Sequence, residues 1–177
     1  MKTLTVLFAA CLCAGAADST VAKVYDGQVR TAESEIVPLV QAMPAGKFGF
    51  APKDGEFKTV RTFALQAKHI SAVLYGVSAV ILGEKPPVDP GKDENGPASI
   101  ESKEQIVQFM KDAFAYAHKA LATMTPEREV QMVKSPFGNG QIALGSLAGL
   151  LAWHSFDHYG QMVVYARMNG IVPPASR

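Results

Sequence analysis

Apolar residues recur at alternating steps of three and four in four segments of the chain, the spacing that places side chains on one face of an α-helix. This periodicity predicts helices over about 18–41, 58–82, 99–125 and 145–169. The second segment is apolar on nearly all sides, so we expect it to be the most buried helix. Its main seam comprises Val60, Phe63, Ala67, Ile70, Leu74, Val77 and Ile81. With no convincing strand and no internal repeat, the fold class is all-α.

Proline and glycine mark the connections between these segments. Pro38 should kink or shorten the last turn of the first helix. Gly83 ends the second helix, and residues 84–97 form a polar crossover long enough to span the end of a bundle. Ser99 is the expected N-cap of the third helix, and residues 130–141 should hold a short turn or an extended piece. Four amphipathic helices with one long crossover predict a four-helix bundle.

The last helix carries polar residues within its apolar seam. Its positions at helical spacing are Leu144, Leu147, Leu151, His154, His158, Gln161, Tyr165 and Met168. Burying polar groups without partners costs roughly 1 to 3 kcal/mol each, so something in the core must satisfy them. A metal ion is the sharpest candidate, because two histidines four residues apart can each direct a ring nitrogen at one ion.

A third ligand must come from another helix. His69 lies on the most apolar helix, whereas His118 lies beside Lys119 and off its helix seam, so His69 is the better candidate. The HExxH protease pattern is excluded, because Ser155-Phe156-Asp157 stands between the histidines and the general-base glutamate is absent.

Three neighbouring residues are candidates for roles in catalysis. Gln161 could be a helper ligand, a substrate-binding amide or a hydrogen-bond partner for an imidazole. Asp157 lies one residue off the seam, which suits orienting a histidine or facing solvent, and Tyr159 could orient a substrate. Without a metal, the same residues would have to form a buried hydrogen-bond network, in which three histidines would be poorly satisfied.

The first 17 residues have the pattern of a secretory signal peptide. Lys2 supplies the positive charge, residues 4–12 the apolar stretch, and Ala14-Gly15-Ala16 the small-residue cleavage site. A lipoprotein signal with Cys11 is a minor alternative. The expected product is a single domain, 18–177, located in the periplasm or outside the cell. Both cysteines, Cys11 and Cys13, would be removed, leaving no thiolate as nucleophile or ligand.

The composition of the remaining chain excludes other classes of function. Without Lys2, 16 basic residues stand against 16 acidic ones and form no basic block, so nucleic acid is not an expected partner. We expect no segment of the remaining chain to span a membrane. A homodimer through an exposed helix face stays open.

These motifs resemble those of the DinB-like family of metal-dependent enzymes. Residues 154–161 contain the His-x-x-x-His pair followed by Gly-Gln, residues 67–71 resemble the histidine motif of the second helix, and Phe50-Ala51-Pro52 resembles the linker before it. The resemblance covers nearly all of the domain. It implies an up-down-down-up bundle in which His69, His154 and His158 bind one divalent ion, with positions open to water or a small-molecule substrate.

The resemblance leaves the reaction and the metal open. The family includes transferases and isomerases that use low-molecular-weight thiols, but reduced thiols are scarce outside the cytoplasm, where a signal peptide would direct the chain. Transferase and hydrolase chemistry therefore both remain, and the alternative is a non-catalytic bundle that binds a metal or a ligand. Three imidazoles suit zinc, nickel, iron or copper.

Overall fold

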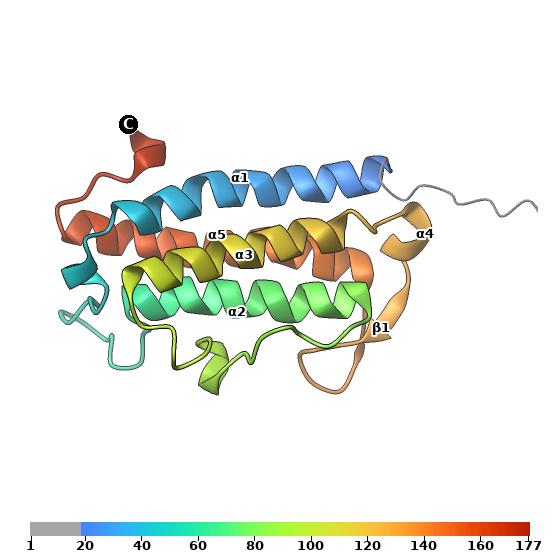
Figure 1. Cartoon of the computed structure of the whole chain (residues 1–177), viewed down its shortest axis with the longest axis horizontal. Helices are drawn as coiled ribbons and strands as arrows, with labels where there is room; N and C mark the ends of the chain where they lie inside the picture. The colour runs from blue at the N-terminus through green and yellow to red at the C-terminus, as the bar shows by residue number, and fades with distance from the viewer. Residues whose placement is uncertain (1–18) are drawn as a thin grey trace, which may run out of the picture.

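A computed structural model describes residues 19–177, so the predicted signal peptide lies outside the described residues. The described chain is mostly helical (Figure 1). Its long helices are α1 (Thr20–Ala42), α2 (Phe63–Leu82), α3 (Lys103–Leu121) and α5 (Leu144–Met168), with a short α4 (Pro126–Glu129). Single 3-10 turns lie at Ala45–Lys47, Lys92–Glu94 and Pro174–Ser176. The all-α fold class is confirmed.

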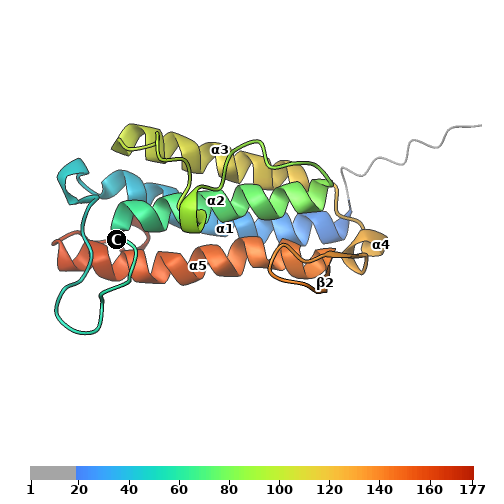
Figure 2. The same cartoon turned by 90° about the horizontal axis from the view of Figure 1, so that it is seen from below.

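The four long helices lie side by side around a common core. α1 and α2 each pack against both α3 and α5. Figures 1 and 2 show the helices extending along the length of the molecule, with the 83–102 crossover running back along the side of α2 that faces away from α1. The largest fully buried side chains include Phe63, Ile70, Phe114, Met110 and Leu121. This arrangement brings the middle of α2 and the middle of α5 together.

The helix α2 is long and apolar enough to cross a membrane, although no membrane-spanning segment was predicted within residues 18–177. Within the bundle, however, 78% of its most apolar stretch is buried. Packing on several sides accounts for this composition, as expected for a central core helix.

Several helix boundaries differ from the sequence-based expectations. α2 begins at Phe63, not near residue 58, because the Thr62 side chain accepts a hydrogen bond from the backbone N–H of Leu65. α3 is capped by Ser102, not Ser99, through a capping box with Gln105. It also ends at Leu121, and Thr125 instead caps α4.

Two other expectations concerned single residues. Pro38 does not shorten α1, which continues to Ala42. Met168, expected on the apolar seam, is 53% exposed because it lies in the final turn of α5, at the edge of the core. Phe48, in the linker after α1, is buried and packs edge-on against Phe63 at the start of α2.

The connector before α5 forms a small β-hairpin, which agrees with the expected extended piece. β1 (Met132–Lys134) pairs antiparallel with β2 (Gln141–Ala143), with Val133 opposite Ile142. Figure 1 shows this hairpin on the same side of α2 as the crossover.

The start of α5 leaves no room for a side chain at Gly145. A Cβ there would lie 2.7 Å from Cγ of Glu129, 3.0 Å from its carbonyl oxygen and 3.1 Å from the hydroxyl of Tyr25. We expect Gly145→Ala to lower the free energy of unfolding by about 1–3 kcal/mol, because the α4–α5 contact must open. Gly149→Ala is the control, since its Cβ would meet only an ordinary contact at 3.9 Å. Urea denaturation of both variants tests this, and equal stabilities would contradict it.

Candidate metal centre

Three histidines from α2 and α5 converge in the bundle. His69 and His158 are buried and His154 is half-buried. The ring centroids lie 5.1 Å apart for His69 and His154, and 4.6 Å apart for each of the other two pairs. The Nε2 atoms of His154 and His158 are 3.2 Å apart. The four-residue spacing on α5 thus places two rings on one face, and helix packing adds the third.

Oxygen atoms fix the orientation of two of these rings. Nδ1 of His69 lies 2.9 Å from the carbonyl oxygen of Glu94, and Nδ1 of His158 lies 2.5 Å from Oε1 of Gln66. Both oxygens can only accept, so each ring carries its proton on Nδ1 and a lone pair on Nε2. Such partners on the second nitrogen are typical of metal-binding histidines.

Burial lowers the pKa of all three imidazoles. The pKa of His154 falls to about 4, where the nearby His69 adds to the effect of burial. The pKa of His158 falls to about 3, with further contributions from His154 and His69. Burial also lowers the pKa of His69, against the opposing effect of its bond to Glu94. The three rings are therefore neutral at pH 7, and their lone pairs are available.

A divalent transition-metal ion fits this donor set. One ring nitrogen from each histidine belongs to a set of atoms within 4.8 Å of one another. Neutral imidazole is a preferred ligand of zinc, nickel and iron. Within residues 19–177, these three histidines are the group of potential ligands that converges in this way.

The family comparison agrees with this geometry. The model of the DinB superfamily matches residues 28–162, which include all three histidines. The chain belongs to the DinB superfamily. A comparison with curated proteins finds no match. The resemblance inferred from the histidine motifs is therefore confirmed, while the metal and the reaction are not fixed by it.

In this DinB superfamily member, Gln66 is the residue that sequence reasoning missed. Its Oε1 accepts from His158, and its Nε2 donates to Oε1 of Gln161 at 2.9 Å. Gln161, considered above as a ligand, a substrate-binding amide or an imidazole partner, is thus connected through Gln66 to the histidine triad, as we call His69, His154 and His158. The sequence could have indicated this role, because Gln66 is a polar residue on an apolar helix and lies three residues before His69, on the same helix face.

The other two candidate residues, Asp157 and Tyr159, have different surroundings in the structure. Asp157 is exposed, and its charge acts to raise the pKa of His154, although burial dominates. Tyr159 is half-buried and lies beside Glu35 of α1; burial and then this carboxylate raise its pKa. The structure therefore brings the charge of Asp157 toward the triad and places Tyr159 against α1.

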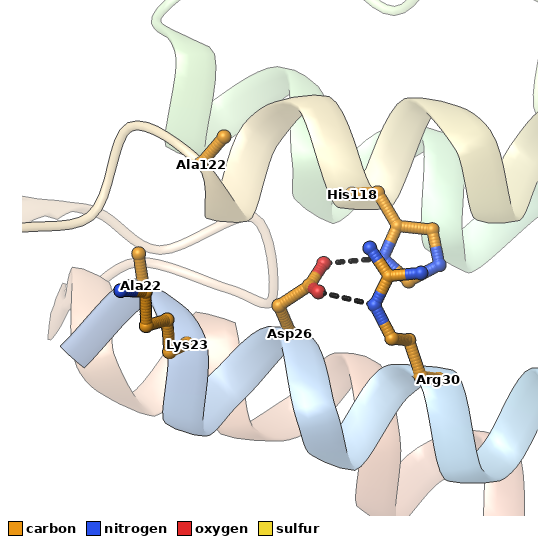
Figure 3. A pocket seen from close by; sticks show the side chains of 6 residues that line it. All are labelled: Ala22, Lys23, Asp26, Arg30, His118 and Ala122. Atoms are coloured by element: carbon orange, nitrogen blue, oxygen red, sulfur yellow. Dashed lines mark hydrogen bonds and ion pairs between the residues drawn. The ribbon is translucent and has the colours of Figure 1, made fainter. Parts of the chain in front are cut away.

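The fourth histidine, His118, lies apart from the triad, between α1 and α3 (Figure 3). Its Nδ1 is 2.5 Å from Asp26, which also accepts from Arg30, and its Nε2 is 3.0 Å from Glu33. Burial acts to raise the pKa of Asp26, but the hydrogen bonds from His118 and Arg30 outweigh it and hold the pKa below its ordinary 3.8. These contacts connect two helices.

The lowered pKa of Asp26 implies a pH-dependent contribution to stability. It is fully present above the ordinary carboxyl pKa of 3.8 and is lost as pH falls through the lowered value in the folded protein. We expect Asp26→Asn to reduce the free energy of unfolding at pH 6 by about 1 kcal/mol or less, with a smaller reduction at low pH. Urea denaturation across pH tests this, and a pH-independent difference would contradict it.

The crossover segment 91–97 is held over the triad by side chains of α2 and the residue just before its N-cap. Arg61 donates to Oδ1 of Asn95 at 2.8 Å and to the carbonyl of Asp93 at 3.0 Å. Lys68 donates to the carbonyl of Pro97 at 2.8 Å. Within this segment, Asp93 and Glu94 adopt left-handed φ values of 55° and 56°, which are unfavourable for residues with a side chain.

We expect Arg61→Met to loosen this segment, because it removes two hydrogen bonds from a charged donor. Backbone amides of residues 93–96 should exchange with solvent about tenfold faster or more. Hydrogen–deuterium exchange by mass spectrometry measures this. Arg30→Met, which changes a contact on α1, is the control, and equal protection of the segment in both variants would contradict the anchoring role of Arg61.

Proposed function

We propose that this protein is a metal-dependent enzyme in which His69, His154 and His158 bind one divalent ion, with zinc, nickel and iron as candidates. The observation that carries the proposal is the convergence of three neutral imidazoles, two of them oriented by hydrogen bonds at the opposite nitrogen. A small molecule is the expected substrate, and transferase or hydrolase chemistry the expected reaction class.

Neighbouring residues orient the rings of His69 and His158 and place a positive charge near the three histidines. Gln66 and the carbonyl of Glu94 hold the N–H groups of His158 and His69, so the opposite nitrogen of each ring keeps a lone pair available where the three histidines converge. When bound, a divalent ion would act as a Lewis acid that polarises a carbonyl or lowers the pKa of a coordinated water or thiol. Arg61 adds positive charge near all three rings, which favours their neutral form.

The alternative is a bundle in which the ion is structural or a ligand is held without turnover. A structural site usually has four protein ligands. Within residues 19–177 the converging group has three members, and Oε1 of Gln161 already accepts a bond from Gln66. This favours a site with an open position.

Cobalt substitution tests whether the position is open. Cobalt-loaded protein should show a change in its visible absorption spectrum when azide is added, because azide enters the coordination sphere. His118→Ala protein, which keeps the triad, should respond in the same way. An azide-insensitive spectrum would contradict the catalytic proposal and support a closed site.

We also propose that the bundle has up-down-down-up topology and that the protein is exported. The topology is supported by the 83–102 crossover, which returns along α2 before α3 begins (Figure 1).

Export is supported by the charged, apolar and small-residue pattern of residues 1–17. Intact mass of the protein from its native cells should correspond to cleavage near Ala16 or Ala17; a chain retaining Met1 or Lys2 would contradict export by this route.

A further inference from the structure

A pocket of about 200 Å³ lies beside α2, under the crossover and the tip of the β-hairpin. Its floor is the α2 face that carries Val73, Gly76 and Val80, and Pro90 and Phe137 contribute to its walls. Among residues 19–177, Glu94 is the only charged residue that lines it, and Glu94 is itself exposed. The pocket is therefore suited to an uncharged apolar group.

Gly76 keeps this pocket open. It lies in the interior of α2, where glycine is unfavourable relative to alanine because it loses more backbone freedom on folding. Helix packing does not explain this glycine, because a Cβ built on it would meet no atom within 4 Å. The missing side chain leaves space in the pocket that a single methyl group would occupy only slightly but that a side chain the size of leucine would fill.

The pocket adjoins the histidine triad along α2. His69, Val73 and Gly76 are spaced four and then three residues apart, which places them on one face of the helix. At 1.5 Å per residue, the floor from Val73 to Gly76 lies about 6–10 Å along the axis from His69. The same Glu94 that lines the pocket binds His69 through its carbonyl oxygen.

We propose that this pocket binds an apolar, ring-sized group of the substrate whose polar, reacting end lies at the triad. An apolar cavity of about 150 Å³ accommodates benzene, so the observed volume suffices for one aromatic ring. The substrate class is then a small molecule with an aromatic or similarly compact apolar group separated from its metal-binding end by a linker of about three atoms. This assignment to a substrate rests on the metal-dependent function proposed above, whereas the affinity of the pocket for an apolar ring does not.

Toluene is the probe for the pocket itself. Added to metal-free and to zinc-loaded protein, it should cause saturable NMR shifts in the amides of Val73, Gly76 and Val80. Gly76→Leu should weaken toluene binding about tenfold or more by filling the pocket, whereas Gly76→Ala should bind toluene within about twofold of the parent. Phe137→Ala changes a half-exposed residue outside the helices and should also weaken binding. Absence of saturable shifts at these amides, or parent-like affinity in both Gly76→Leu and Phe137→Ala, would overturn the inference.

Two thiols test the connection between the pocket and the triad. On cobalt-loaded parent and Gly76→Ala protein, 3-phenylpropanethiol should bind about tenfold or more tightly than 1-propanethiol, because its ring enters the pocket. In Gly76→Leu protein the two affinities should become similar. Equal affinities in the parent would overturn the connection. If neither thiol perturbs the cobalt spectrum, the metal-dependent proposal fails and the substrate assignment with it, while localised toluene shifts would still establish an apolar binding site.

Discussion

His158→Ala is expected to reduce the metal content of the purified protein from about one equivalent to less than about a tenth. The variant keeps His69 and His154, but two imidazoles do not complete a stable transition-metal site in a folded protein. It also leaves Oε1 of Gln66 without its donor. Elemental analysis of protein purified without chelator or histidine tag measures this loss, and His154→Ala should give the same result.

The matched control is His118→Ala. His118 lies between Asp26 and Glu33, so this variant removes one histidine without touching the triad. It should retain the metal of the parent, although it loses helix contacts. If His158→Ala retained a full equivalent, or if the parent bound no zinc or nickel when these were supplied, the three-histidine assignment would be wrong.

Gln66→Leu is expected to weaken zinc binding by about 10- to 100-fold while the three ligands remain in place. The amide oxygen of Gln66 fixes the proton of His158 on Nδ1 and the ring in its orientation. Leucine fills a similar volume but accepts no hydrogen bond, so the ring becomes free to rotate and the N–H loses its partner. Competition with a chromophoric zinc chelator measures the dissociation constant.

Two further variants separate orientation from simple destabilisation. Gln66→Glu retains an acceptor for the His158 N–H and should restore most of the affinity. Gln108→Leu makes the same change at an exposed position on α3 and should leave affinity unchanged. Equal losses in Gln66→Leu and Gln66→Glu would contradict an orienting role for this side chain.

The local sequence predicted the positions of the long helices but not the residues at which α2 and α3 begin. The apolar periodicity located all four long helices, because a buried stripe on a helix requires that spacing. The starts of α2 and α3 were missed by several residues, since Thr62, Ser99 and Ser102 are all acceptable caps by residue type. The choice depends on which N–H groups the packed helix leaves to be satisfied, as in the capping box of Ser102 and Gln105.

The histidine site was likewise predictable in part from the sequence. The spacing of His154 and His158 by itself determined that both rings share one face of α5, because helix geometry fixes side chains four residues apart. It also determined an all-α chain in which polar groups interrupt an apolar seam. These properties depend only on the local repeat of a helix and on the cost of burying unsatisfied polar atoms.

Only the tertiary structure decided which groups complete the site. His69 and Gln66 reach the two α5 histidines because α2 packs against α5, and Glu94 reaches His69 because the crossover returns along α2. The pocket beside the triad likewise depends on how the crossover and the hairpin cover Gly76. Contacts between residues 25 to 92 positions apart are set by helix register and loop path, which no local sequence pattern encodes.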